Sequence, residues 1–153
     1  MRFQGRNLRK GRVSEPGRIY LLTTVTRDRA PLFAQWPAAC LVAREIHAMA
    51  GRTGISTLAW VLMPDHLHWL VKLESGELGR YVQRLKSRTA IALNWLNNHT
   101  GAVWQRGYHD HAVRNEADVK SMARYIVANP LRAGLVKNIG DYSLWDVTWL
   151  SRA

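Results

Sequence analysis

The sequence predicts an α+β domain in which an antiparallel sheet carries its helices mainly on one face. Its 153 residues, 47% of them hydrophobic, suffice for one buried core. Segments rich in β-branched and aromatic residues alternate with segments of helical periodicity, and two strand-like segments are separated by a two-residue turn, which predicts a hairpin. No repeat, low-complexity tract or linker divides the chain. We therefore expect a single domain over residues 1–153, with a basic arm at about residues 1–18.

The first half of the chain predicts a strand, a helix and the hairpin. Residues 19–26 are β-branched and aromatic-rich and lie between a Pro-Gly pair and a charged turn, which is typical of a strand. Residues 37–52 predict a helix, because a proline suits its first turn and an apolar stripe follows. Residues 56–63 and 66–73 predict two strands, joined by the turn Pro64-Asp65.

The second half predicts a helix, a strand and another helix. Residues 78–97 show the 3.6-residue apolar period of a long helix. Residues 104–114 predict a fourth strand, with Gly107 as a bulge. Asn115 can cap a helix over residues 116–129. This order of elements is that of ferredoxin-like and RRM-like folds.

Basic residues are concentrated in two tracts. The chain has 22 Lys and Arg against 11 Asp and Glu; residues 1–29 hold eight basic and two acidic side chains, and residues 80–114 hold six and one. With seven tryptophans available for stacking, this distribution favours nucleic acid as the partner. The alternative is a generally basic protein whose charges are merely solvated.

The basic side chains that we expect to contact DNA lie in the arm, in the second predicted helix and before the fourth strand. Those of the helix recur at i, i+4, which predicts a phosphate-binding row, although an ordinary solvated helix face has the same pattern. The residues are Arg2, Arg6, Arg9, Lys10 and Arg12 of the arm, Arg80, Arg84 and Arg88 of the helix, and Arg106.

Composition excludes several other classes of protein. No run of 18 apolar residues predicts a membrane span, and the basic start does not lead to a signal-peptide cleavage site. The single cysteine, Cys40, excludes an internal disulfide and zinc sites of the CxxC type. We therefore expect a cytoplasmic, nucleoid-associated protein without a membrane partner, and any metal must be held by histidine, carboxylate or amide oxygen.

Two histidines on the second strand of the hairpin are the strongest chemical signal. Because side chains alternate along a strand, His66 and His68 point to one face, about 6–7 Å apart, and Leu67 and Trp69 point to the other. The apolar side chains would face the helices and leave the histidines on an open face, where they can share a metal. The alternative is two half-exposed histidines that only form hydrogen bonds.

A second pair, His109 and His111, also alternates on a predicted strand. Asp110 between them lacks the apolar character of Leu67, and a bulge near Gly107 would disturb the alternation. We therefore expect phosphate contact or structural hydrogen bonding from this pair, with metal ligation as the alternative.

Tyr125 and Asn129 share one row of the last predicted helix, next to its apolar stripe. A phenol and an amide oxygen at i, i+4 can reach a common metal-bound phosphate, and the amide would complete a His/His/Asn ligand set. Periodicity alone favours the alternative, a tyrosine at the edge of the core whose hydroxyl is in water.

Four segments together resemble a known family. MPDHLHWL, WQRGYHDHAVR, ARYIVANPLRAGLV and YSLWDVTWL resemble, in order and spacing, the REP-associated tyrosine transposases, a branch of the single-tyrosine HUH nucleases. The resemblance implies the HUH fold and a metal-dependent endonuclease and strand transferase that acts on single-stranded DNA at REP-type hairpins. It implies His66 and His68 as metal ligands, Asn129 as the third ligand and Tyr125 as the nucleophile.

The resemblance also implies Mg²⁺ or Mn²⁺ as the metal and a 5′-phosphotyrosine intermediate. It favours a monomer over the dimer of related insertion-sequence enzymes. Two other functions stay open from the sequence: an RRM-like protein that binds single-stranded nucleic acid without cutting it, and a catalytically idle relative that only binds its hairpin.

Overall fold

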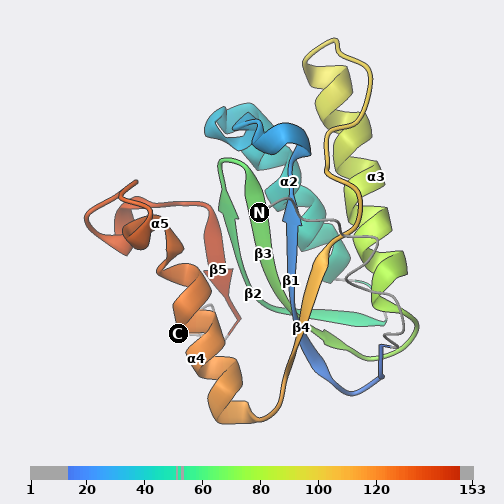
Figure 1. Cartoon of the computed structure of the whole chain (residues 1–153), viewed down its shortest axis with the longest axis vertical. Coiled ribbons are helices and arrows are strands. Elements are labelled where there is room, and N and C mark those ends of the chain that lie inside the picture. Colours follow the sequence, from blue (N-terminus) through green and yellow to red (C-terminus); the bar gives the residue numbers. More distant parts are fainter. Residues whose placement is uncertain (1–13, 51, 53, 149–153) are drawn as a thin grey trace.

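The computed structural model describes residues 14–50, 52 and 54–148 and contains a five-stranded antiparallel sheet (Figure 1). The strand order is β4-β1-β3-β2-β5. The predicted hairpin is present, because β2 and β3 pair from Met63 opposite His66 to Ile55 opposite Leu73. The strands are β1 (Ile19–Val25), β2 (Ile55–Met63), β3 (His66–Leu73), β4 (His109–Val113) and β5 (Trp145–Val147).

The two longer helices pack together on one face of the sheet. These are α2 (Trp36–Ala50) and α3 (Leu78–Leu96), which contribute Val42, Ile46 and Leu85 to one core cluster. That cluster includes Leu67 and Trp69 of β3, as the alternation of the strand predicts. The α+β class and the position of most helical residues on one face are therefore confirmed.

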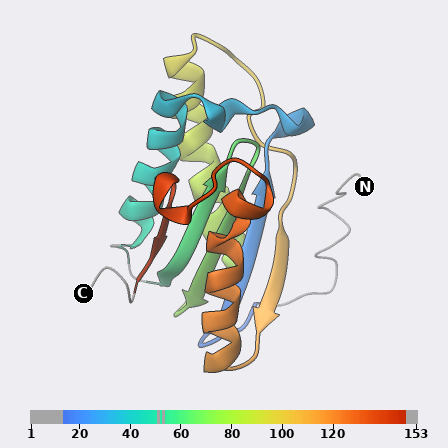
Figure 2. The same cartoon turned by 90° about the vertical axis from the view of Figure 1, so that its left-hand side faces the viewer.

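A third helix covers part of the opposite face. Helix α4 (Glu116–Val127) packs Ala123 and Ile126 against Val61 and Leu70 in a second cluster. Figure 2 shows α4 apart from the α2–α3 pair, across the strands. The expectation that the histidine face is open is therefore wrong in part. Leu70 shares that face with the histidines, and its burial requires a covering helix.

The fourth strand is shorter than predicted. Its regular pairing begins at His109, whereas Trp104 forms only an isolated bridge to Thr26. Gly107 adopts a φ of +76°, which favours glycine, and Lys86 Nζ donates hydrogen bonds to the carbonyls of Gln105 and Gly107. Burial lowers the pKa of Lys86 to about 8, so most of this side chain is still protonated at neutral pH and can donate both bonds.

The C-terminal part contains two elements that the sequence analysis does not predict. The helix expected to end at Asn129 ends at Val127, and a short helix, α5 (Asn129–Arg132), follows with Pro130 in its first turn. Strand β5 pairs with β2, Val147 lying opposite Ala59. Within the described residues, no helix combines the length and the apolar character needed to cross a membrane.

Candidate active site

His66 and His68 lie side by side on the face of β3 that α4 partly covers. Their ring centroids are 4.9 Å apart and the rings are nearly perpendicular. Both side chains are half-buried. His68 is in the middle of the sheet, opposite Thr23 of β1 and Val61 of β2. The sheet therefore fixes the backbone of the pair and holds the two rings close enough to act together.

Each imidazole is oriented by a hydrogen bond at Nδ1. Asp65 Oδ1 lies 2.7 Å from Nδ1 of His66, and Thr23 Oγ1 lies 2.8 Å from Nδ1 of His68. A carboxylate only accepts, so Nδ1 of His66 carries a proton and donates it to Asp65, which leaves Nε2 as the ring atom that can meet another partner. Partners of this kind fix the tautomer and the ring orientation of metal-binding histidines.

Asp65 is itself held from two directions. Its other carboxylate oxygen lies 3.3 Å from a guanidinium nitrogen of Arg29, and its carbonyl accepts a hydrogen bond from the backbone N–H of Thr26 at 2.9 Å. Neither Asp65 nor Arg29 is among the site residues predicted from the sequence. The one sequence feature that could have indicated Asp65 is its position directly before His66. Arg29 could not have been found in this way, because it lies 36 residues away from Asp65 in the sequence.

The pKa of His68 is lowered from 6.5 to about 4. Burial is the largest cause, followed by the charges of His66 and Arg132. At neutral pH the imidazole is therefore uncharged, which is the form that binds a metal.

This low pKa predicts a pH-dependent stability. Between pH 6.5 and about 4 the unfolded chain binds a proton at His68 and the folded chain does not, so the free energy of unfolding must fall as the pH falls through this window. The loss is up to about 3 kcal/mol. Urea unfolding between pH 4 and 7 measures it. The loss should shrink in His68→Gln and persist in the control His99→Gln, at an exposed position; equal losses in both variants would contradict the assignment to His68.

Tyr125 is the exposed tyrosine among the five of the chain, with 59% of its surface accessible. The hydroxyls of three others are occupied: that of Tyr20 accepts a bond from the backbone of Glu15, and those of Tyr81 and Tyr142 donate to backbone carbonyls. The fifth, Tyr108, is buried. Accessibility therefore favours Tyr125 as the nucleophile on grounds independent of the sequence motif.

Arg132 lies over the ring of Tyr125 and its charge acts on His68. Its guanidinium carbon lies 3.9 Å from the centroid of the Tyr125 ring, which is a stacked cation–π arrangement, and its charge also lowers the pKa of His68. Arg132 ends α5, seven residues after Tyr125. Its role cannot be predicted from the sequence, because the contact with Tyr125 depends on the turn of the chain between α4 and α5.

Asn129 is half-buried and begins α5. This short helix packs against β2, the strand that places Met63 opposite His66. Asn129 therefore belongs to an element next to the histidine strand, and its role as the third ligand stays a prediction.

The two histidines supply two of the donors that a divalent metal would need. Within the described ranges, no three His, Cys, Asp or Glu side chains are grouped so that they could hold a metal ion. A site built on His66 and His68 therefore needs a third protein ligand of another type, and the amide oxygen of Asn129 is of such a type.

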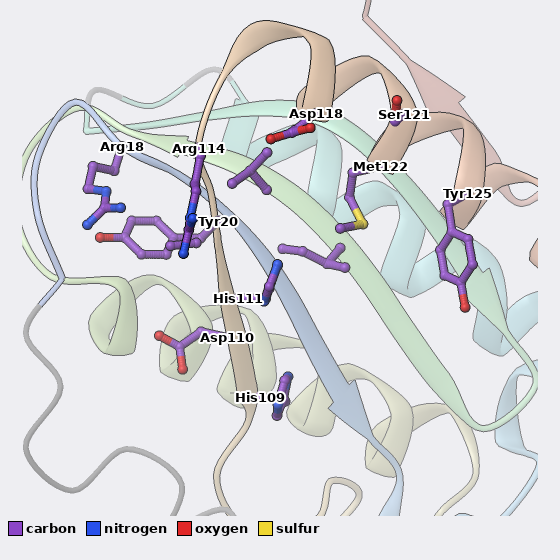
Figure 3. Close-up of a pocket in the computed structure, with 13 residues that line it drawn as sticks. Arg18, Tyr20, His109, Asp110, His111, Arg114, Asp118, Ser121, Met122 and Tyr125 are labelled. Carbon is purple, nitrogen blue, oxygen red and sulfur yellow. The ribbon is translucent and has the colours of Figure 1, made fainter.

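The second histidine pair lies on the same face as the first. Thr23 is opposite His68 on one side and opposite His109 on the other, so the three residues form a row across β3, β1 and β4. His111 is exposed, whereas Asp110, which lies between His109 and His111 in the strand, is buried. His109 and His111 line a pocket that reaches Tyr125 (Figure 3).

The predicted DNA-binding arginines are separate from the histidines. Arg80 and Arg84 are exposed on α3, on the far side of the sheet, and Arg106 is exposed before β4. Arg88 of the same row forms an ion pair with Glu45 of α2 at 2.7 Å. The residues of the arm lie outside the described part of the chain; they are Arg2, Arg6, Arg9, Lys10 and Arg12.

Residues 17–129 match the family described as Transposase IS200 like, over a range that includes both histidine pairs, Tyr125 and Asn129. The chain belongs to the IS200-like transposase family. Among its curated relatives, it is 30% identical over 86 residues to the REP-associated tyrosine transposase of Escherichia coli K12, which covers 55% of this chain and 49% of the relative. A relative from Haemophilus influenzae is 28% identical over 98 residues, or 56% and 55% of the two chains. The chain spans about half the length of these curated relatives.

Two solved transposase structures have the same fold. A REP-associated tyrosine transposase bound to a REP hairpin matches with a TM-score of 0.71 and 25% identity, over 88% of this chain and 79% of that one. A candidate transposase from Deinococcus radiodurans matches with a TM-score of 0.51 and 20% identity, over 78% and 95%, and supports the fold alone. The resemblance to REP-associated tyrosine transposases is therefore confirmed.

Proposed function

We propose that this IS200-like transposase is a metal-dependent endonuclease and strand transferase that acts on single-stranded DNA at REP-type hairpins. One observation carries the proposal: the exposed Tyr125 lies under Arg132, whose charge also acts on His68, and His68 belongs to a pair of adjacent histidines whose Nδ1 atoms are already engaged. The likeness of the chain to a transposase that was solved bound to a REP hairpin supports a REP-type hairpin as the substrate. We further propose that it works in the cytoplasm, at the nucleoid, as a monomer.

The proposed reaction is a transesterification. The Tyr125 oxygen attacks a DNA phosphorus, the bond to the 3′ oxygen breaks, and that oxygen takes up a proton as a 3′-hydroxyl. The phosphate stays on the tyrosine as a 5′-phosphotyrosine, which a second 3′-hydroxyl can attack to rejoin strands. Bond energy is retained in the phosphotyrosine, so no nucleotide cofactor is required. Arg132 restrains the Tyr125 ring and places a positive charge where the phosphate gains negative charge.

His66, His68 and Asn129 would hold the metal. Mg²⁺ or Mn²⁺ at this position would withdraw charge from a nonbridging phosphate oxygen and orient the scissile group. Imidazole ligands suit Zn²⁺ as well, so the choice of Mg²⁺ or Mn²⁺ comes from the family resemblance. The protein's own contribution is to keep His68 neutral through burial and to orient the two imidazoles through hydrogen bonds from Asp65 and Thr23.

Incubation with an end-labelled single-stranded hairpin and Mn²⁺ tests the proposal. We expect a protein-linked DNA fragment that survives SDS, is absent with EDTA and is absent with fully duplex DNA of the same sequence. Tight hairpin binding without any adduct, at every metal tried, would instead identify a protein that binds nucleic acid without cutting it.

We propose that Arg80 and Arg84 contact the phosphates of the duplex stem. Each phosphate contact contributes about 0.9 to the slope of log affinity against log salt on duplex DNA, so Arg80→Gln with Arg84→Gln should reduce the slope by about two. Affinity for matched and unmatched stems should fall alike, because phosphate contacts carry no base information. Arg88 is left unchanged because it neutralises Glu45.

A salt titration by fluorescence anisotropy measures this slope. The control is Arg44→Gln with Lys137→Gln, which removes the same charge at exposed positions outside the row. A slope equal to that of the wild type in the α3 double variant would mean that the row is an ordinary solvated helix face.

A further inference from the structure

The turn that follows β1 has a strained backbone. Asp28 and Arg29 are consecutive residues with φ values of +56° and +52°, in the left-handed region that favours glycine. Residues with a side chain occupy this region at a cost in energy, and they persist there where the surroundings hold them in place. Here the surroundings include the candidate active site, because the turn is hydrogen-bonded to Asp65.

Hydrogen bonds hold this turn on the residues that lead into β3. The hydroxyl of the buried Thr26 lies 2.8 Å from the carbonyl oxygen of Ala30 and 3.1 Å from that of Asp65. The backbone N–H of Thr26 also donates to the Asp65 carbonyl, and the N–H of Arg29 donates back to the carbonyl of Thr26 at 3.1 Å. The backbone therefore fixes where Arg29 begins relative to Asp65.

Arg29 presents its guanidinium to the carboxylate that orients His66. A guanidinium nitrogen lies 3.3 Å from Asp65 Oδ2, and the other oxygen, Oδ1, lies 2.7 Å from Nδ1 of His66. One carboxylate therefore bridges the arginine and the histidine. A rotation of the carboxylate that breaks one of these contacts also disturbs the other.

The ion pair is poorly placed to stabilise the fold. The Arg29 side chain is 60% exposed, and water screens such a pair, so that it contributes little to folding. It does not offset the strain of two left-handed residues. The side chains of Asp65 and His66 are only 24% and 18% exposed, so the contact at the histidine is the protected one.

We propose that Arg29 is a positioning residue for the metal-binding histidines: the strained turn holds its guanidinium on Asp65, and Asp65 keeps the His66 ring turned for metal binding through Nε2. The inference rests on the proposed function, because it takes His66 as a metal ligand. It extends the site to the turn after β1, through a residue that touches neither the metal nor the DNA.

Substitution of Arg29 separates positioning from simple electrostatics, because the two predict opposite signs. Removal of a positive charge near a cation site strengthens metal binding by charge alone, whereas loss of positioning weakens it. Arg29→Gln should bind Mn²⁺ about three- to tenfold more weakly than the wild type in an electron paramagnetic resonance titration. Asp65→Asn should lose at least about tenfold, since partners of metal-binding histidines contribute about 10- to 100-fold to affinity. Arg29→Lys should recover part of the loss.

Arg27→Gln is the matched control, because Arg27 is an exposed arginine of the same turn that is paired with Asp28, at 3.9 Å. Its Mn²⁺ affinity should equal or exceed that of the wild type. In the Asp65→Asn background, Arg29→Gln should add less than about twofold, because Arg29 acts through the carboxylate. Equal losses in both backgrounds, or undiminished Mn²⁺ affinity in Arg29→Gln, would overturn the positioning role.

Nuclear magnetic resonance reads the same contact in the metal-free protein. The Nδ1 proton of His66 donates to Asp65, so we expect its resonance to exchange slowly with water. Exchange should be severalfold faster in Arg29→Gln and unchanged in Arg27→Gln, with the urea midpoint of both variants close to that of the wild type. Unchanged exchange in Arg29→Gln would contradict the proposal without reference to any metal.

Failure of the positioning role and failure of the proposed function have different signatures. Weaker hairpin binding in EDTA combined with full Mn²⁺ affinity in Arg29→Gln would make Arg29 a phosphate contact and overturn the positioning role. An SDS-resistant adduct in the wild type combined with full Mn²⁺ affinity in Arg29→Gln also overturns that role alone. No adduct in the wild type, with Mn²⁺ binding weakened in Arg29→Gln, overturns the nuclease and retains Arg29 as a positioning residue of a metal site.

Discussion

Tyr125→Phe abolishes the SDS-resistant adduct and leaves affinity for the hairpin within a few-fold of the wild type. The substitution removes one oxygen and no charge, and the phenyl ring retains the stack with Arg132. Tyr125 is 59% exposed and is not part of the core, so stability should change by less than about 0.5 kcal/mol. Gel analysis of labelled DNA measures the adduct, and anisotropy measures binding.

Tyr108→Phe is the control for this variant. Tyr108 is the alternative nucleophile, because it directly precedes the second histidine pair in the sequence. It is buried, so an extended DNA strand has little access to it. Its variant should still form the adduct. An adduct that persists in Tyr125→Phe would show that another tyrosine is the nucleophile, and Tyr108 would then be the first to test.

The histidine pair can be predicted from sequence because it depends on a local rule. Alternation along β3 places Leu67 and Trp69 under α2 and α3 and His66 and His68 on the other face, whatever the rest of the chain does. The hairpin register is similarly local, since a two-residue turn fixes which residues of β2 and β3 are opposite each other.

The surroundings of the pair depend on contacts between distant segments, and the sequence pattern does not contain them. The apolar stripe of α4 shows that this helix is covered on one side, but it does not show that the covering surface is the histidine face of the sheet. The Nδ1 partner Thr23 comes from a strand 45 residues earlier. Neither relation has a periodicity that a reader of the sequence can recognise.

The C-terminal elements are missed for a different reason. Strand β5 has three residues, which is too short to show an alternating pattern. Asn129-Pro130 is a strong helix-stop signal, and it does end α4 near the predicted place, but the chain then forms α5 at once. Arg132 reaches the Tyr125 ring only because of that second turn of helix.

His66→Ala and His68→Ala should each remove metal-dependent cleavage, by at least about 100-fold, since a metal acting as a Lewis acid contributes several kcal/mol to the transition state. Each variant should also bind Mn²⁺ more weakly in an electron paramagnetic resonance titration, which reports the metal site without requiring activity. Circular dichroism and urea unfolding must show an intact fold, because His68 is in the centre of the sheet.

His109→Ala and His111→Ala are the matched controls, since they remove the same side chain from the same face of the sheet. They lie on β4, beyond Thr23, whose hydroxyl is bonded to His68. If they contact phosphates or form structural hydrogen bonds rather than hold a metal, both variants retain measurable cleavage and wild-type Mn²⁺ affinity. The reverse ranking, with Mn²⁺ affinity lost in the β4 variants and kept in the β3 variants, would move the metal to the second pair.

Because Thr23 lies between the two pairs, Thr23→Val adds a test of the ranking. It removes the Nδ1 partner of His68 alone, and it should weaken Mn²⁺ binding only if the metal is held on β3.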